Sequence, residues 1–159
     1  MKKSFDLRVK ACDLGMAAGC GSVGDFFSDG SGGVERSLSK AAEYWAKSCV
    51  APDKWMSQVE VQMNAFHCST LAELYETGNG VERSIAKAVE LHGKACDGKV
   101  APSCAALSRL YAVGDGIEKS VTKSREFHEK ARALHVVSSC DNMKKFMSHT
   151  GCANLQTFK

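Results

Sequence analysis

The chain has 159 residues, of which 44% are apolar and 25% are charged. These proportions are close to those of globular proteins and argue against a disordered or collagen-like chain. The net charge of +3 comes from 21 basic and 18 acidic residues, which is too even a balance to predict binding to nucleic acid or to an anionic membrane surface. No apolar run approaches the roughly 18 residues of a membrane span. Eight cysteines and only two prolines point to redox or metal chemistry on a scaffold that permits long helices.

The chain is built from internal repeats, which indicate its architecture. One segment, KAVELHGKAC, recurs with substitutions at four places, which begin at Lys3, Lys40, Lys87 and Lys123. A second segment alternates with the first and begins with a cysteine at Cys20, Cys68 and Cys104. Both segments carry apolar residues at helical spacing, as in Leu71, Leu74 and Tyr75, so each predicts an amphipathic helix.

Turn and capping residues separate the two kinds of helix. The cysteine-first helix runs into a glycine pair, such as Gly78 and Gly80, which suits a left-handed C-cap and a tight turn. A serine then begins the next helix, and its hydroxyl can accept a hydrogen bond from the first turn. The three serines are Ser37, Ser84 and Ser120.

A pair of antiparallel helices cannot cover its own apolar faces, so neighbouring pairs must stack. The sequence therefore predicts an all-α fold, an α-solenoid formed by one array over residues 1–159. We expect, in chain order, a lone second-type helix at 3–15, a repeat at 20–49, an insertion at 50–65, repeats at 66–96 and 102–137, and a divergent C-terminal cap at 138–159.

The cysteines recur at one address, where one helix pair gives way to the next. Cys12 and Cys20 are separated by seven residues, and Cys96 and Cys104 repeat this spacing. At an antiparallel junction these positions face each other, close enough for a disulfide. The insertion separates a third pair, which consists of Cys49 and Cys68.

A fourth bridge would join Cys140 to Cys152 and requires a bend near Gly151, because a straight helix would hold the two about 18 Å apart. Two other interpretations of the cysteines stay open. Cysteine with histidine is a zinc ligand set, and His92 lies four residues before Cys96, although no C-x2-C motif accompanies them. Buried reduced thiols would suit a cytosolic protein but leave the paired spacing unexplained.

The composite pattern C-x2-L-x2-LY-x2-G-x-G-V-x2-S-x2-KA-x5-KAC, written from residues 68–96, resembles the Sel-like repeat (SLR) family, which is related to tetratricopeptide repeats. It is more closely similar to the cysteine-rich branch of that family, in which C-x7-C pairs bridge consecutive repeats. The resemblance covers about residues 3–132. It implies a scaffold or adaptor that binds protein or peptide and has no cofactor.

The cysteine-rich members that the chain resembles are exported bacterial proteins or reside in the mitochondrial intermembrane space. Disulfides belong to such oxidising compartments, so we expect the periplasm or the extracellular space, with the intermembrane space as the alternative. The chain begins within a repeat and stops soon after another helix would start, so either it is part of a longer exported protein or its ends serve as caps.

Some bacterial members of this branch are associated with penicillin binding and β-lactam hydrolysis, which the resemblance makes an alternative function. Each capping serine begins an S-x-x-K motif, as Ser84 does with Lys87, and that motif holds the nucleophile of penicillin-recognising enzymes. The motif recurs where a cap is needed anyway, and its S-D-N and K-T-G companions are missing. We therefore expect no catalytic residue. His92 and His128 share a repeat address and are interpreted as surface or packing residues.

Binding is expected on the concave side of the solenoid, if the cysteine-first helices line it. The positions beside their apolar stripe include Asp25, Thr70, Glu73 and Arg109, and three of these differ in charge at one repeat address. A selective peptide groove would vary in this way, and so would ordinary solvent-facing positions. Glu73 and Glu76 are interpreted as a solvated carboxylate pair. No metal site is expected.

Overall fold

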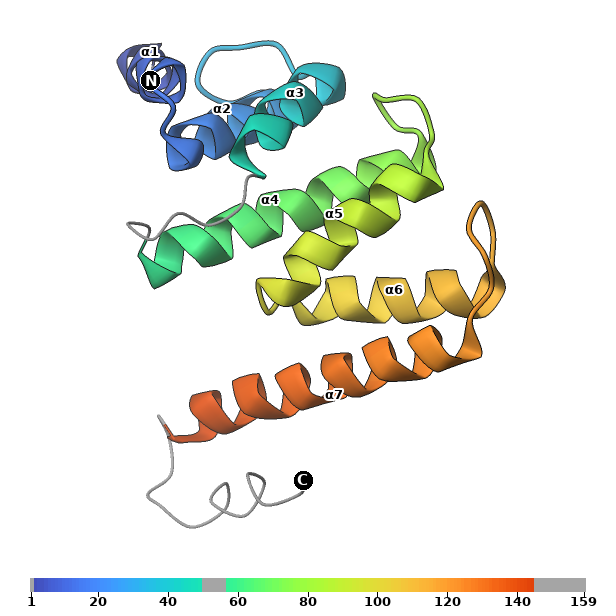
Figure 1. Cartoon of the computed structure of the whole chain (residues 1–159). Coiled ribbons are helices and arrows are strands. Elements are labelled where there is room, and N and C mark those ends of the chain that lie inside the picture. Colours follow the sequence, from blue (N-terminus) through green and yellow to red (C-terminus); the bar gives the residue numbers. More distant parts are fainter. Residues whose placement is uncertain (1, 50–56, 145–159) are drawn as a thin grey trace.

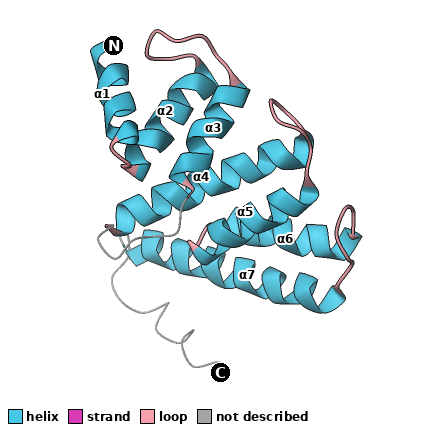
Figure 2. Cartoon of the chain, turned by 45° about the horizontal axis from the view of Figure 1, so that its top comes forward, coloured by secondary structure: helices cyan, strands magenta, loops and turns pink. Residues whose placement is uncertain are grey.

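The computed structural model describes residues 2–49 and 57–144, with side chains described for residues 3–49 and 57–135. Within these ranges the chain is helical, with loops and no strand (Figure 2). In chain order the helices are α1 (Lys2–Asp13), α2 (Ala17–Asp29), α3 (Leu38–Ser48), α4 (Gln58–Thr77), α5 (Ile85–Asp97), α6 (Ala101–Val113) and α7 (Val121–Lys144).

The helices form antiparallel hairpins that stack one on the next (Figure 1). α2 pairs with α3, α4 with α5, and α6 with α7, and each of these pairs packs more extensively than the helices joined between hairpins. α1 packs against α2 as the lone second-type helix that the sequence predicts. The predicted all-α solenoid is confirmed.

Two helices are longer than expected. α4 begins at Gln58 and so includes the second half of the predicted insertion, because Ser57 and Glu60 form a capping box that starts the helix there. α7 continues to Lys144, through residues assigned to the C-terminal cap. No glycine or proline occurs within α7 to end the helix earlier.

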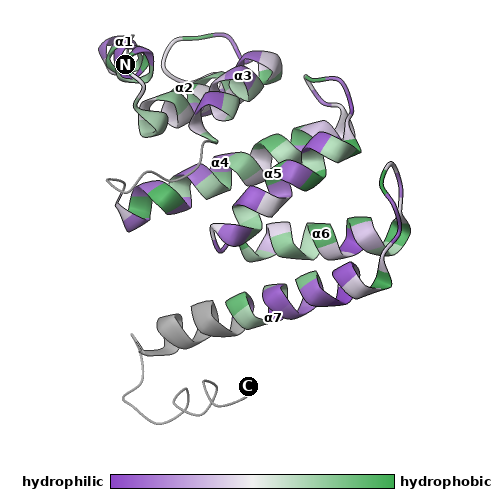
Figure 3. Cartoon of the chain, viewed as in Figure 1, coloured by the Kyte–Doolittle hydropathy of each residue, from purple (hydrophilic) through white to green (hydrophobic). Residues whose placement is uncertain are grey.

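The core lies between the helices of each hairpin and between successive hairpins. Trp45 and Leu71 are only 4% and 2% exposed and belong to a cluster shared by α3 and α4. Further along the stack, Cys96, Cys104 and Leu107 form a second cluster, against which α7 packs. Apart from the residues that pack on this cluster, the described part of α7 is largely hydrophilic (Figure 3).

The turns inside the hairpins repeat the same hydrogen bonds. The N–H of Ser37 donates to Phe27 O and that of Ser84 to Tyr75 O, at 2.7 and 2.9 Å. Gly80 follows α4 with φ of 78°, and its α-carbon lies against Leu38, where a Cβ would come within 2.7 Å. A residue with a side chain would be strained there, both by its backbone conformation and by contact with Leu38.

Among the described residues, no helix is both long enough and apolar enough to cross a membrane.

Candidate binding groove between repeats

Disulfides join α1 to the first hairpin and each hairpin to the next. Cys12 bonds to Cys20, Cys49 to Cys68 and Cys96 to Cys104, with Cα–Cα distances of 4.5, 5.0 and 4.9 Å. These three predicted pairs are confirmed. The sulfur atoms bond to one another, so the zinc and reduced-thiol interpretations do not apply to them.

The predicted bridge between Cys140 and Cys152 lies outside the residues whose side chains are described, and it stays a prediction.

The serine–lysine motifs have structural partners in every repeat. The Oγ atoms of the serines accept hydrogen bonds from the lysine N–H three residues on, at distances of 3.3–3.4 Å. Each lysine Nζ also lies over an aromatic ring of the preceding helix, 5.0–5.3 Å from its centroid. The triplets of serine, lysine and ring are Ser37/Lys40/Phe27, Ser84/Lys87/Tyr75 and Ser120/Lys123/Tyr111. The motif thus caps the second helix and ties it to the first by a cation–π contact.

A buried polar network joins α4, α5 and α6. His92 is 1% exposed, and its Nε2 lies 2.8 Å from Glu76 Oε1. The other ring nitrogen, Nδ1, lies 3.2 Å from Ser103 Oγ, which donates to Ser69 Oγ at 2.7 Å. Arg109 binds the second oxygen of Glu76. The network satisfies the polar groups that the junction buries.

This network corrects one expectation. The sequence predicts Glu73 and Glu76 as a solvated pair, but the Glu76 side chain is only 13% exposed and accepts bonds from two helices. The packing role expected for His92 fits its burial, whereas His128 at the same repeat address is exposed. The sequence does contain a signal for the burial of His92, because His92 occupies the repeat position that the buried Trp45 fills in the previous repeat.

A second buried histidine lies one junction earlier. His67 Nδ1 is 2.9 Å from Ser48 Oγ, and its Nε2 is 3.5 Å from Asp25 Oδ2. Trp45 stacks on the His67 ring and donates to Asp25 Oδ1 at 3.0 Å. α2 has a glycine at Gly21, where a Cβ would overlap the His67 ring. Asp25, predicted as a groove residue, therefore holds the Trp45 ring of α3 by a hydrogen bond and lies beside the His67 ring of α4.

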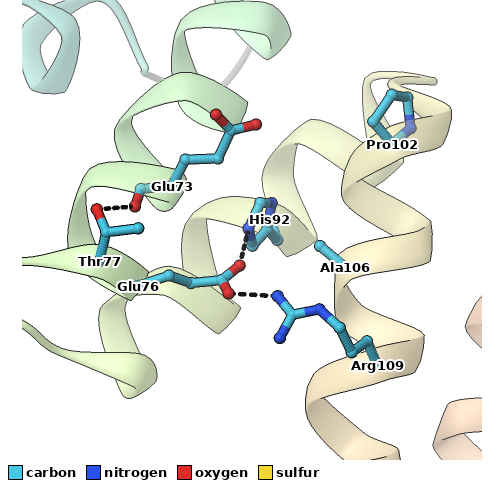
Figure 4. A pocket seen from close by; sticks show the side chains of 7 residues that line it. All are labelled: Glu73, Glu76, Thr77, His92, Pro102, Ala106 and Arg109. Carbon is cyan, nitrogen blue, oxygen red and sulfur yellow. Dashed lines mark hydrogen bonds and ion pairs between the residues drawn. The ribbon is translucent and has the colours of Figure 1, made fainter.

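A cavity of about 270 Å³ opens beside the first network (Figure 4). Its lining comes from α4, α5 and α6 and consists of Glu73, Glu76, Thr77, His92, Pro102, Ala106 and Arg109. Two of the predicted groove residues, Glu73 and Arg109, meet there. Thr70 lies one turn before Glu73 and donates to Phe66 O at 3.2 Å, and Asp25 lies at the other junction.

The charges of this cavity are unevenly paired. Arg109 is bound to Glu76, so its charge is offset within the wall. Glu73 is exposed, and no ion pair involves it in the described part of the chain. In Figure 4 its carboxylate points away from the Glu76–Arg109 pair. Within the described part of the chain, Glu73 is therefore a lining carboxylate with no cation paired to it.

The repeats also match a known family model. Residues 17–49, 70–100 and 101–135 each match the Sel1 repeat. The chain belongs to the Sel1 repeat family. The Sel1 matches leave out three described helical segments, which are α1, the part of α4 before residue 70 and the part of α7 after residue 135. No curated protein matches the chain.

Solved structures with this fold include three bacterial proteins. A Sel1 repeat protein from Oxalobacter formigenes is 23% identical with a TM-score of 0.62, over 80% of this chain and 88% of its own. Helicobacter pylori cysteine-rich protein B is 26% identical with a TM-score of 0.55, over 89% and 92%. The third is c5321, a protective antigen of uropathogenic Escherichia coli with an SLR fold, at 22% identity and a TM-score of 0.67. The match covers 87% of this chain but only 27% of that antigen's length.

Proposed function

We propose that this Sel1 repeat protein binds an extended peptide segment of a partner protein in the groove between its second and third hairpins. Sel1 repeats form scaffolds for protein interaction, and this chain is such a scaffold. The observation that supports the location is the cavity at the α4–α6 junction. Glu73 of α4 and Arg109 of α6 are both exposed there.

The groove is suited to recognition because a buried polar network fixes the side chains of its wall. Glu76 is fixed by His92 and Arg109, and three helices contribute to this one network. A preorganised wall loses little conformational entropy when a ligand binds. The serine and lysine side chains that resemble a hydrolase motif are used in capping and ring contacts, so the proposal assigns the protein no reaction.

We further propose an oxidising location, either periplasmic or secreted, with the mitochondrial intermembrane space as the alternative. The support is threefold: three disulfides at the hairpin junctions, their persistence in oxidising compartments, and the similarity to a cysteine-rich bacterial protein. Mass spectrometry of protein alkylated in intact cells checks this, since free thiols at Cys96 and Cys104 would contradict it.

The binding proposal is tested by selecting a phage-displayed library of 12-residue peptides on the full oxidised chain. We expect enriched clones that bind the unmodified chain and lose binding to both Glu73→Lys and Arg109→Glu. Glu43→Lys is the control, because Glu43 is an exposed residue of α3 that does not line the cavity. No enrichment over an albumin control, or undiminished binding to both groove variants, would contradict the proposal.

A further inference from the structure

An exposed apolar line runs along the first half of α4. Val59, Met63 and Phe66 are 68%, 46% and 58% exposed. Their spacing of four and three residues places them on one face of the helix. We call these three residues the α4 stripe. Single exposed apolar residues are ordinary, but three neighbours on one helix face form a contiguous apolar patch that a partner can cover.

The stripe leads to the cavity. Thr70 and Glu73 follow Phe66 at the same helical spacing, and Glu73 stands at the cavity wall. At about 1.5 Å per residue, Glu73 lies roughly 10 Å beyond Phe66 and roughly 21 Å beyond Val59 along the helix. Apolar and acidic parts thus form one continuous surface on one element.

The stripe belongs to this chain and not to the repeat. The corresponding helices α2 and α6 begin at Ala17 and Ala101, within a few residues of their cysteines, whereas α4 begins ten residues before Cys68. The Sel1 match resumes only at residue 70. Of these three helices, only α4 has the extra N-terminal turns. The α4 stripe lies on these turns and extends to the groove.

Charge indicates what completes this surface. Glu73 has no cation paired with it among the described residues, because Arg109 is already bound to Glu76. α4 contains no lysine or arginine, so the α4 helix of a second copy laid on the stripe would bring no such cation to Glu73. A ligand that covers the stripe and also neutralises Glu73 needs both hydrophobic side chains and a cation.

We propose that the α4 stripe and Glu73 together bind an extended segment of a partner protein that carries hydrophobic side chains followed by a lysine or arginine. The hydrophobic side chains cover Val59, Met63 and Phe66, and the cation pairs with Glu73. An extended chain advances about 3.3 Å per residue, so about three residues separate the last hydrophobic contact from the cation. The inference rests on the proposed function and names the chemistry of its ligand.

The first test reads the sequences of peptides selected on the oxidised chain. We expect clones with two or more aliphatic or aromatic residues and a lysine or arginine about three residues away. The best clone, labelled with fluorescein, is then titrated by fluorescence anisotropy against the chain and its variants. Its counterpart with norleucine in place of the cation is titrated in parallel.

Two matched pairs of variants separate the site from general effects. Val59→Ser should weaken binding at least threefold, while Val121→Ser, at a similarly exposed valine of α7, should leave it unchanged. Glu73→Gln should weaken binding at least fivefold, and Glu43→Gln should not. The norleucine peptide should bind the chain and Glu73→Gln equally, because the charge that Glu73 recognises is gone.

Several results would overturn this inference and leave the proposed function intact. One such result is a set of selected peptides that lose binding to Arg109→Glu but contain no lysine or arginine. Another is a set whose binding is unchanged by Val59→Ser. Either would show that the groove binds a different kind of ligand. A molar mass of two chains in light scattering that falls to one with Val59→Ser would identify a second copy as the occupant. A synthetic peptide of residues 145–159 that competes with the probe would identify the chain's own C-terminal segment. Failure to enrich any peptide would contradict both proposals.

Discussion

Buried His92 of α5 pairs with partly buried Glu76 of α4, and Nε2 and Oε1 lie 2.8 Å apart. The pair joins the two helices of the middle hairpin, and through Ser103 and Arg109 it reaches the next hairpin. The floor of the groove and the junction between hairpins are therefore the same set of side chains.

Replacing Glu76 should destabilise this junction. Glu76→Ala leaves His92 Nε2 buried without its acceptor, and loss of a hydrogen bond to a charged group costs about 1.5–3 kcal/mol. Glu73→Ala, one turn earlier and exposed, should change the free energy of unfolding by less than about 0.5 kcal/mol. Urea unfolding of both variants followed by circular dichroism measures the difference, and equal effects would contradict the role given to Glu76.

The disulfide that closes the longer loop should stabilise the fold more. On the chain-entropy model, removing the Cys96–Cys104 bridge, with a separation of 8 residues, costs roughly 2.5 kcal/mol. The Cys49–Cys68 bridge spans 19 residues, and its removal costs roughly 3.3 kcal/mol. Paired cysteine-to-alanine variants compared by urea unfolding give the order. If the shorter loop proves costlier to open, native packing rather than loop length sets the effect.

Ser84 should act through its cap. Ser84→Ala removes the acceptor of the Lys87 N–H and should cost about 1 kcal/mol of stability. Ser84→Asp keeps an acceptor there and should remain near the original stability in thermal melts. A chromogenic β-lactam that the chain hydrolyses, and that a folded Ser84→Ala variant does not, would contradict this assignment.

Two glycine substitutions should have opposite effects. Gly21→Ala places a methyl group on the buried His67 ring, and overpacking of this kind costs about 1–3 kcal/mol. Gly93 lies inside α5 with no atom within 4 Å of a Cβ built there, so Gly93→Ala should stabilise by about 0.5–1 kcal/mol. Differential scanning calorimetry of the two variants should move the melting temperature in opposite directions, and a fall with Gly93→Ala would be the contrary result.

The start of α4 should weaken in acid. The Ser57 N–H, together with its hydroxyl, donates to Glu60 and holds the pKa of that carboxyl below its ordinary value of 4.5. Because the folded pKa is the lower one, the charged carboxyl adds stability above the unfolded pKa, and this contribution is lost as pH falls through the folded pKa. Glu60→Gln keeps the capping box without titrating.

The measurement compares melting temperatures at pH 7 and pH 3. The Glu60→Gln variant should lose less stability between these values than the unmodified chain, whereas Glu43→Gln should lose as much as the unmodified chain. An equal loss in both variants would exclude Glu60 as the titrating group.

Local signals made much of the fold predictable. The repeat of KAVELHGKAC, the glycine pairs and the capping serines act within a few residues, and the C-x7-C spacing fixes the bridges once two helices meet. The repeat pattern predicts a boundary at residue 66, because it is anchored on Cys68, whereas the capping box of Ser57 and Glu60 starts α4 at Gln58.

The candidate site was predictable only in part. Glu73 and Arg109 share a repeat address, and the structure brings them to one cavity. The partners of Glu76 could not be read from spacing, because contact with His92 and Arg109 depends on how three helices rotate about one another. For the same reason the bond from Trp45 to Asp25, at the address of Glu73, could not be read from spacing.

The position of the sulfur bridges has a consequence for how the molecule comes apart. In a linear array the surface between successive units is the place where fraying starts, and here each of the three described bridges spans such a surface. A thiol reductant should therefore loosen the coupling between hairpins before it weakens any single hairpin, and convert one cooperative melting event into several. In the cell, redox conditions would then affect the coupling between hairpins more than the folding of each hairpin.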